Sequence, residues 1–412
     1  MKITKRLFAT IISLTMALSM TACDSSDDSL SDSQIAENSE KWLTIENGVL
    51  VKCDENAEGK IVVPDGVTFI GVRAFKECRK ITDITLPDTV TDIGDYAFAT
   101  CTELESISVP DSVITIREGA FSACESLEEI TIPENVTTIG EKAFYDCDKL
   151  EDITIDEDNK YYCSVDSVIF DKSMETIICY PAAKKDKEYV IPDTVTTIYK
   201  NAFYSCKNLE SVIIPDGVTT IGVYAFFDSN VKTFDIPDSV TEIGAGAFAY
   251  CDFETVIIPD GVTSIKRGTF SWCNRLSSVT IPDSVTKIED SAFYSCGSLS
   301  WITIPDSVTE IGAEAFAYCG FRTVIIPDSV TKIGAGAFSF CESLANITIP
   351  DSVTEIGEKA FAYCDFLTVT IPDSVTKIGA GAFSDNYIIS VTYKDKTYTY
   401  DNIEELYTIQ ED

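Results

Sequence analysis

The chain has no histidine among its 412 residues, and this absence excludes several kinds of chemistry. Without imidazole there is no Ser-His-Asp or Cys-His nucleophile, no imidazole general base and no histidine ligand for zinc or iron. Basic residues are also few, because 31 Lys and Arg stand against 67 Asp and Glu, which gives a formal net charge of -36. Binding phosphates needs clustered cations, so the composition also argues against nucleic acid as a partner.

The first residues are typical of an export signal. Lys2, Lys5 and Arg6 precede an apolar run, residues 7–20, that is too short for a convincing membrane span. We therefore assign residues 1–22 to a signal peptide. The segment that ends in Ala22 and Cys23 resembles a bacterial lipobox, so we expect Cys23 to be diacylated. The alternative is an ordinary signal cleaved after small residues.

Residues 23–40 are acidic, rich in serine and nearly free of apolar side chains, which predicts a solvated tether. The expected location is outside the cell, with the chain anchored by lipid to the outer face of the bacterial cytoplasmic membrane or to the cell surface. Contact with a membrane is expected through that N-terminal lipid only.

A repeat governs most of the remaining chain, because 13 of the 14 prolines lie in the phrase I-P-D-S-V-T and its variants. Consecutive prolines are 23 or 22 residues apart, with one interval of 59 between Pro133 and Pro192. A unit of this size has too few apolar residues to form its own core, so it must stack on its neighbours.

One unit, residues 281–303, illustrates the structure that we expect. Leu299, Ile302 and Ile304 have the spacing of a short strand, and Pro305 ends it at a turn. The four-residue spacing of Ile288, Ala292 and Cys296 predicts a single helical turn on the opposite side. Glycine follows the second Ile in most units but not in all, so we expect no positive φ there.

The consensus C-x-x-L-x-x-I-x-I-P-x-x-V-x-x-I-G-x-x-A-F resembles the BspA-like, or type 5, leucine-rich repeats of bacterial surface proteins. The resemblance covers roughly residues 61–386. It implies a right-handed, β-rich leucine-rich-repeat solenoid of about 13 coils with terminal caps. It also implies adhesion, or interaction with host or matrix proteins, rather than catalysis.

Two stretches of repeats, 61–155 and 191–386, are joined and bounded by non-repeat segments. Residues 41–60 contain Asn47-Gly48 between two apolar runs, which predicts a hairpin cap. Residues 156–190 are predicted to be an irregular insert or an enlarged repeat with two strand-like runs. Residues 387–412 predict a C-terminal cap made of a hairpin and a closing helix.

Eleven of the 15 cysteines form one column of the repeat, and we expect them to be buried free thiols. Disulfides or a metal are the less favoured alternatives, because parallel side chains hold the Cβ atoms apart and no local CxxC pair is present. Cys163 and Cys179 of the insert lie outside the column and are the most plausible disulfide pair. Whether they are bonded is left open at this point.

A second column holds one acidic residue per unit, twelve Asp and Glu134. We expect these carboxylates to accept backbone N–H bonds in Asx-type turns, and we favour that interpretation over calcium binding.

The outward positions of the predicted strands form the candidate interaction surface: Trp301, Ile213, Ile257, Ile325, Thr280, Thr303 and Thr348. A recognition surface and plain β-propensity explain these residues about equally well. A second stripe, of aromatic residues, directly precedes the column cysteines: Tyr250, Trp272, Tyr318, Phe340 and Tyr363. We interpret it either as packing along the edge of the solenoid or as another contact zone.

We therefore expect a protein without catalytic activity, cofactor or metal that binds a protein ligand through its solenoid surface. The alternatives are a glycan-binding scaffold in which Trp301 and the aromatic stripe stack on sugars, and a structural spacer without a specific ligand. The sequence does not identify the ligand or the oligomeric state.

Overall fold

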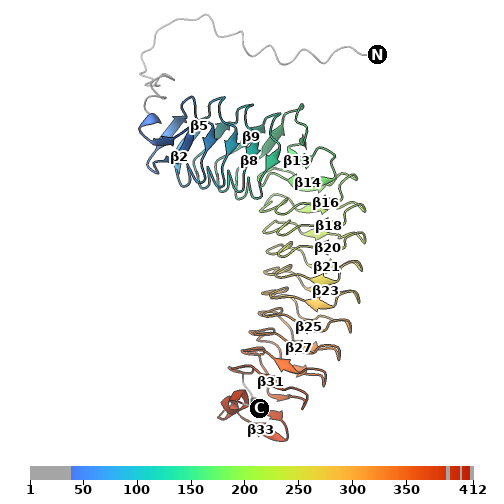
Figure 1. The fold of residues 1–412 in the computed structure, drawn as a ribbon. Helices are drawn as coiled ribbons and strands as arrows, with labels where there is room; N and C mark the ends of the chain where they lie inside the picture. Colours follow the sequence, from blue (N-terminus) through green and yellow to red (C-terminus); the bar gives the residue numbers. More distant parts are fainter. Residues whose placement is uncertain (1–38, 387–389, 400, 409–412) are drawn as a thin grey trace, which may run out of the picture.

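The computed structural model describes residues 39–386, 390–399 and 401–408. Within them the chain forms a β-solenoid of about 15 turns with almost no helix (Figure 1). The sequence predicted 13 coils. The difference arises because one strand of the N-terminal hairpin and one strand of the insert each pair with the adjacent coil and so add a turn. The signal peptide, almost all of the tether and Cys23 lie outside the described residues.

Most coils contribute one short strand to each of two sides of the solenoid. One side, which we call the strand face, carries the strands before the prolines, which pair in parallel within short sheets of two or three strands and do not form one continuous sheet. Its strands are β3 (Glu58–Val62), β5 (Lys80–Thr85), β7 (Ser106–Ser108), β9 (Glu129–Ile132), β11 (Asp152–Ile155), β15 (Glu188–Val190), β17 (Ser211–Ile213), β19 (Thr233–Phe234), β21 (Thr255–Ile257), β23 (Ser278–Thr280), β26 (Thr323–Ile325), β28 (Asn346–Thr348) and β30 (Thr368–Thr370).

The other side carries two-residue strands that also pair in parallel. They are β4 (Phe69–Ile70), β6 (Asp92–Ile93), β8 (Thr115–Ile116), β10 (Thr138–Ile139), β16 (Thr197–Ile198), β18 (Thr220–Ile221), β20 (Glu242–Ile243), β22 (Ser264–Ile265), β24 (Lys287–Ile288), β25 (Glu310–Ile311), β27 (Lys332–Ile333), β29 (Glu355–Ile356) and β31 (Lys377–Ile378).

The helical turn predicted from Ile288, Ala292 and Cys296 is wrong. The chain forms a succession of turns there, because two residues per coil adopt left-handed backbone angles, in this coil Ser291 (φ 54°) and Ser295 (φ 60°). Positive φ angles interrupt an α-helix. The glycine after the second Ile has no positive φ, as predicted, and where it occurs it packs closely against the preceding coil. A Cβ on Gly379 would lie 2.2 Å from the backbone nitrogen of Glu358 in the preceding coil.

Phenylalanine forms the centre of the core. Phe75, Phe98, Phe121 and Phe144 stack one above another with ring centroids 5.1–5.8 Å apart. A second stack continues from Phe203 to Phe383. Each ring fills space that its own coil cannot enclose, so stability depends on neighbouring coils.

The insert divides the solenoid into two arms. It forms three antiparallel strands, β12 (Tyr162–Val165), β13 (Val168–Asp171) and β14 (Thr176–Cys179), rather than the two runs that the sequence predicted. Adjacent residues of β13 face different cores, since Ile169 belongs to the core of residues 50–155 and Val168 to the core that extends to Leu406. We call residues 49–155 the N-terminal arm and residues 176–386 the C-terminal arm. They meet at an angle near β13 and β14 (Figure 1).

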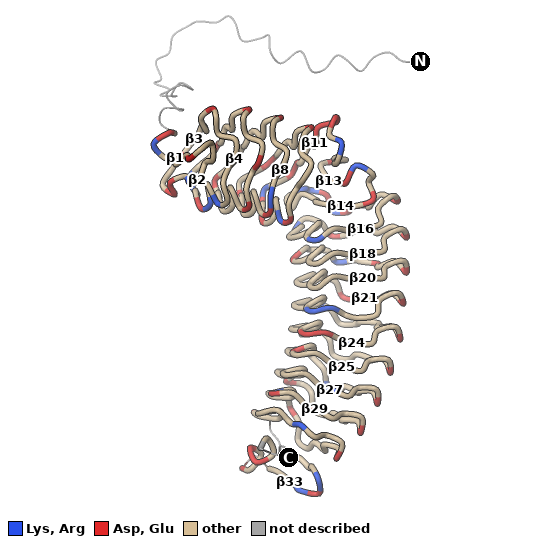
Figure 2. Tube along the Cα trace, in the orientation of Figure 1, with Lys and Arg blue, Asp and Glu red and all other residues tan. Residues whose placement is uncertain are grey.

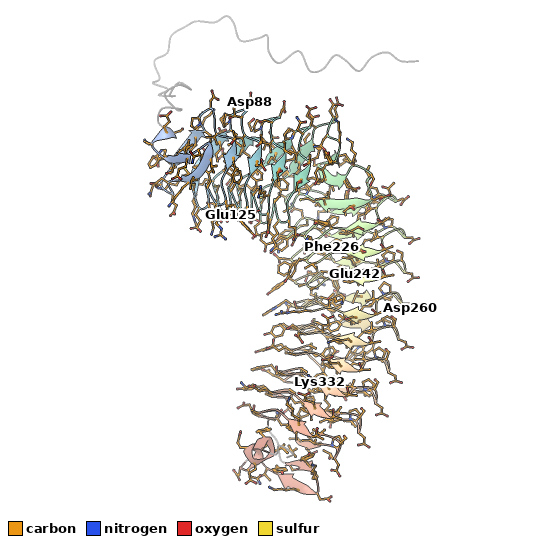
Figure 3. All side chains as sticks on the ribbon, viewed as in Figure 1. Asp88, Glu125, Phe226, Glu242, Asp260 and Lys332 are labelled. Carbon is orange, nitrogen blue, oxygen red and sulfur yellow. The ribbon has the colours of Figure 1, made fainter. Side chains whose placement is uncertain are left out.

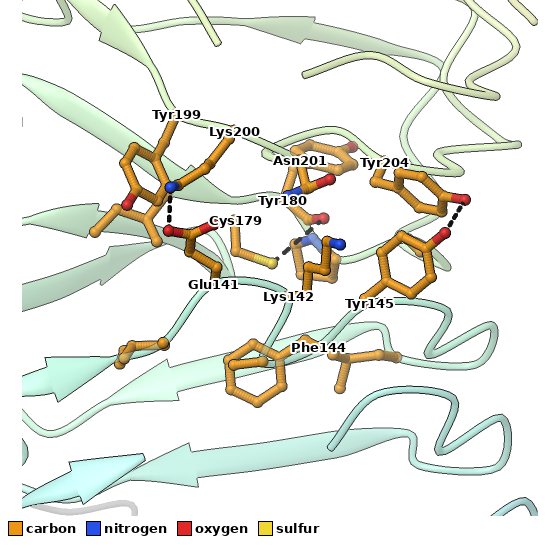
Figure 4. A pocket seen from close by; sticks show the side chains of 17 residues that line it. Glu141, Lys142, Phe144, Tyr145, Cys179, Tyr180, Tyr199, Lys200, Asn201 and Tyr204 are labelled. Atoms are coloured by element: carbon orange, nitrogen blue, oxygen red, sulfur yellow. Dashed lines mark hydrogen bonds and ion pairs between the residues drawn. The ribbon is translucent and has the colours of Figure 1, made fainter. Parts of the chain in front are cut away.

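At this elbow, side-chain contacts join the arms beside a small cavity (Figure 4). On the C-terminal side of the cavity, the Tyr180 backbone N–H donates to the Ala202 carbonyl at 2.8 Å, as the Phe203 N–H donates to the Ala225 carbonyl in the next coil. Tyr145 and Tyr204 join their hydroxyls across the gap, with ring centroids 4.1 Å apart. Glu141 and Lys200 form an ion pair.

Both predicted hairpins are present. The N-terminal one pairs β1 (Leu43–Glu46) with β2 (Val49–Cys53), and its turn residues Asn47 and Gly48 both have positive φ, as a type I′ turn requires. At the other end β32 (Ser390–Tyr393) pairs with β33 (Lys396–Tyr398), and the closing helix is the 3-10 helix η1 (Ile403–Thr408). The two hairpins cover the outermost coils.

Candidate interaction surface

Two columns of side chains point outward from the strand face. Most strands there alternate between outward and inward residues, so two outward positions of each coil align with those of the next wherever strands pair in parallel. The first column of the C-terminal arm is Glu188, Ser211, Thr233, Thr255, Ser278, Trp301, Thr323, Asn346 and Thr368. The second is Val190, Ile213, Asp235, Ile257, Thr280, Thr303, Ile325, Thr348 and Thr370.

The apolar members of these columns are among the most exposed large hydrophobic side chains of the arm. Ile325 is 77% exposed, Ile257 69%, Trp301 55% and Ile213 49%. Thr280, Thr303 and Thr348 are also exposed. All seven candidate residues therefore lie on one face, as the sequence predicted, and none of the seven side chains is buried in the core.

Trp301 lies in a coil whose outward residues form no strand. Leu299, Ile302 and Ile304 are buried and Trp301 and Thr303 are exposed, so the predicted alternation is confirmed. The backbone, however, is not paired, since β23 pairs with β21 on one side and β26 pairs with β28 on the other. Among the described residues no other aromatic ring contacts Trp301. Its indole is 55% exposed on the strand face.

A shallow groove lies further along the same face. It runs over the coils of β26, β28 and β30 and is lined by Ile325, Thr348, Thr370, Asp351 and Pro372, among others. The exposed side chain of Leu367 precedes the last of these strands. The face thus combines apolar, hydroxyl and acidic groups along several coils.

The acidic column forms a ridge beside the second column, which we call the acidic ridge: Asp65, Asp88, Asp111, Glu134, Asp193, Asp216, Asp238, Asp260, Asp283, Asp306, Asp328, Asp351 and Asp373. All of these side chains are exposed. Figure 2 shows acidic residues at the outer tips of the coils, and Figure 3 labels Asp88 and Asp260 on the side away from the inner angle of the elbow.

The predicted Asx-type turns are not what forms these corners. The turn is closed by the backbone, for example by Val285 N–H donating to the Pro282 carbonyl at 3.1 Å. Ser284 at the third position donates to the Val262 carbonyl of the preceding coil at 2.7 Å. Asp283, at the second position, points into solvent, and no described backbone N–H donates to its carboxylate. Within the described residues no three His, Cys, Asp or Glu side chains are arranged to hold a metal ion.

The aromatic stripe is a stacked ladder. Its rings lie on the opposite edge from the acidic ridge, with centroids 4.1–5.7 Å apart, and many neighbours are nearly parallel, such as Phe340 and Tyr363 at 4.3 Å and 7°. The complete ladder is Tyr145, Tyr204, Phe227, Tyr250, Trp272, Tyr294, Tyr318, Phe340 and Tyr363.

The sequence prediction missed four rungs, Tyr145, Tyr204, Phe227 and Tyr294, because they stand one residue earlier in the unit. The signal that finds them is that each of these coils has one aromatic residue at either of the two positions before the column cysteine, or before Ser229 where serine replaces it. Because neighbouring rings cover much of one another's faces, the ladder is edge packing more than a platform for sugars.

The cysteine column is buried, as predicted, and all described cysteines are free thiols. Ten of the eleven column thiols donate to a carbonyl of the preceding coil, such as Cys296 Sγ to Phe270 O at 3.1 Å, whereas Cys206 donates to Tyr204 O of its own coil. Burial raises the pKa of the Cys251 and Cys364 thiols to about 12, so they are protonated at neutral pH. The pairing of Cys163 with Cys179 is wrong, because β13 separates their strands and the two side chains pack against different cores.

Comparison with known proteins agrees with this architecture. The BspA type leucine rich repeat region matches in six copies, over residues 44–164, 160–277 and 263–390. A leucine-rich repeat protein from Eubacterium ventriosum is 26% identical, with a TM-score of 0.59 over 85% of this chain and 92% of that chain. One from Bacteroides ovatus is 30% identical, with a TM-score of 0.49 over 79% and 92%. A search of curated proteins found no match.

A third solved structure, a leucine rich cell surface protein from Faecalibacterium prausnitzii, is 30% identical over 70% of this chain and 72% of that chain, with a TM-score of 0.39. The chain belongs to the BspA-type leucine-rich repeat family. Such solenoids are typically binding scaffolds without catalytic activity, and leucine-rich repeat proteins generally bind proteins. Among the described residues no helix has the length and apolar character needed to cross a membrane.

Proposed function

We propose that this protein binds a protein ligand through the strand face of its C-terminal arm, at the cell surface. The observation that carries the proposal is the exposure of Ile213, Ile257, Trp301 and Ile325 on one face of a rigid scaffold. Large apolar side chains in water favour association, and a tryptophan among aliphatic neighbours is typical of the centre of an interface. Parallel coils hold these side chains in fixed register, which lowers the entropy lost on binding.

The test compares equivalent positions in the two arms. Ile257 and Thr131 are both exposed second-column residues, one in each arm. With a ligand taken from a protein array, Ile257→Asp in the full chain should weaken binding at least tenfold, by placing a charge against an apolar contact. Thr131→Asp is the matched control and should leave the affinity unchanged. Equal effects of the two variants would contradict the proposal.

We further propose that the chain is exported and tethered by a lipid on Cys23, for adhesion or contact with host or matrix proteins. This rests on the apolar run 7–20, the small residues before Cys23 and the acidic segment after it. Palmitate should label the wild-type chain, and Cys23→Ala should release it into the medium. Unlabelled wild-type protein would contradict the lipid anchor.

Glycan binding is the second candidate, and the exposed, unstacked ring of Trp301 favours it. Aromatic faces stack on sugar rings, and the faces of the ladder are largely covered by other rings, so Trp301 is the platform to test. Glycan arrays probed with the full chain and with Trp301→Ala separate this function from protein binding. If neither array finds a ligand, the chain is a structural spacer.

A further inference from the structure

We propose that the ligand of the C-terminal arm presents an apolar centre flanked by Lys or Arg side chains, which meet the acidic ridge. The inference rests on the proposed function and adds the chemistry of the partner. Its basis is the position of the ridge relative to the exposed apolar residues.

The ridge borders the second column along the whole arm. Each exposed aliphatic residue of that column is followed three positions later by an exposed carboxylate, as in Ile213 and Asp216, Ile257 and Asp260, and Ile325 and Asp328. Asp306 stands in the same relation to Thr303, beside Trp301. A ligand that covers the apolar residues therefore also reaches the carboxylates.

The ridge has no cations of its own. Ion pairs elsewhere on the solenoid are frequent, but among the described residues none of them involves a carboxylate of the ridge. The flank beside the first column is mixed, since Glu210 lies between Lys187 and Lys232 at 2.9 Å from each. Only one border of the face is thus uniformly charged.

Like charges at a coil spacing of ~4.8 Å repel by under about 1 kcal/mol per neighbour in water, and their summed field attracts cations. A partner with Lys or Arg beside its apolar contact relieves that repulsion and gains in association rate. A second copy of this chain would bring ridge against ridge at a net charge of -36 each, so self-association fits this face poorly. A neutral ligand would leave the ridge unused.

Synthetic peptides test the inference on the full chain. From Ile213 to Thr370 the face spans seven coil steps, or about 34 Å, which a helical peptide of about 22 residues matches. One peptide carries a leucine stripe flanked by lysines, and the control peptide has glutamate in place of every lysine. Affinity is measured by fluorescence anisotropy at low and high salt.

We expect the lysine peptide to bind at least tenfold more tightly than the glutamate peptide, with an affinity that falls as salt rises. The triple variant Asp260→Asn, Asp306→Asn and Asp328→Asn should weaken the lysine peptide about tenfold, as the loss of three exposed ion pairs. The matched triple Asp65→Asn, Asp88→Asn and Asp111→Asn in the N-terminal arm removes the same charge and should leave binding within about twofold.

Three outcomes would overturn the inference. Equal weakening by both triples would show attraction to net charge alone. Equal binding of the two peptides, lost in Ile257→Asp, would leave the proposed function standing and refute the cationic partner. Lysine-peptide binding that is insensitive to Ile257→Asp and Trp301→Ala, or absent altogether, would refute the docking of such partners on this face.

Discussion

The two arms share a fold but differ in the charge of their strand faces. In the N-terminal arm the first column is Lys60, Asp83, Ser106, Glu129 and Asp152, four charged residues out of five, and Lys60 pairs with Asp83. From Ser211 to Thr368 the first column has no charged residue, and in the second column Asp235 is the one charge between Val190 and Thr370. Outward residues do not form the core, so this face varies freely while the buried alternation is kept.

The arms also differ in the length of their coils. Prolines of the N-terminal arm are uniformly 23 residues apart, whereas four intervals of the C-terminal arm are 22. The missing residue falls between the column cysteine or serine and the next core residue, which in the short coils is Val231, Phe253, Phe321 or Phe366 instead of leucine. These side chains are buried, so a change of core residue accompanies the shorter loop.

The largest expected effect comes from breaking one core at a time. Phe98→Ala in the N-terminal arm and Phe293→Ala in the C-terminal arm each remove a ring buried between two stacked neighbours, at a cost of about 3–5 kcal/mol. Because the insert separates the two cores, hydrogen exchange read by mass spectrometry should increase mainly in the mutated arm. Equal loss of protection in both arms would mean that the elbow couples them fully.

A smaller effect is expected at the elbow itself. Tyr204→Phe removes the hydroxyl bond to Tyr145 and should cost about 1 kcal/mol, while it keeps the ring stack. Solution scattering should then show a broader range of angles between the arms. Tyr250→Phe is the matched control, because no described hydrogen bond involves its hydroxyl. If both variants scatter alike, the tyrosine pair does not hold the angle.

Thiol labelling sharpens the comparison without disturbing the interior. Native protein should react slowly with a thiol reagent at its column cysteines, because they are buried, and among the described cysteines the partly exposed Cys163 should react first. In Phe98→Ala the thiols from Cys78 to Cys147 should become reactive before those of the C-terminal arm. Rapid labelling of all thiols in the native wild type would contradict the closed packing.

The sequence was sufficient to predict those structural features that the same residue type marks in every repeat. Proline, the paired isoleucines and the cysteine column located the turns, the core and the outward columns, and Asn47-Gly48 located a hairpin. The left-handed positions were not predictable in this way, since Arg73, Tyr96 and Gly119 occupy the same place in successive coils. Stacking on the neighbouring coil imposes that conformation, and no single residue type marks it.

The elbow was not predictable either, because it depends on contacts between segments far apart in the chain. Tyr145 and Tyr204 are 59 residues apart, and nothing in either unit shows that they meet. Val168 and Ile169 likewise face two different cores because their strand, β13, lies between the arms. The candidate interaction residues could be predicted because outward positions follow from alternation alone. That the acidic column is exposed beside the second column became clear only from the observed geometry of the turn.

The smallest expected effect concerns the charges that border the face. The pKa of the Glu210 carboxyl is lowered from 4.5 to about 2 by hydrogen bonds from Lys187 and Lys232. A carboxyl with a lowered folded-state pKa stabilises the fold above its unfolded pKa, and this contribution is lost as the pH falls through the folded value. The melting temperature of Glu210→Gln should therefore be slightly lower than that of wild type above about pH 4.5 and should converge with it towards about pH 2.

Asp83→Asn is the counterpart in the N-terminal arm. Because Lys60 lies 3.9 Å from Asp83, the difference in melting temperature between this variant and wild type should be smaller. A difference for Glu210→Gln that persists below pH 2 would show that the side chain acts by packing and not by charge.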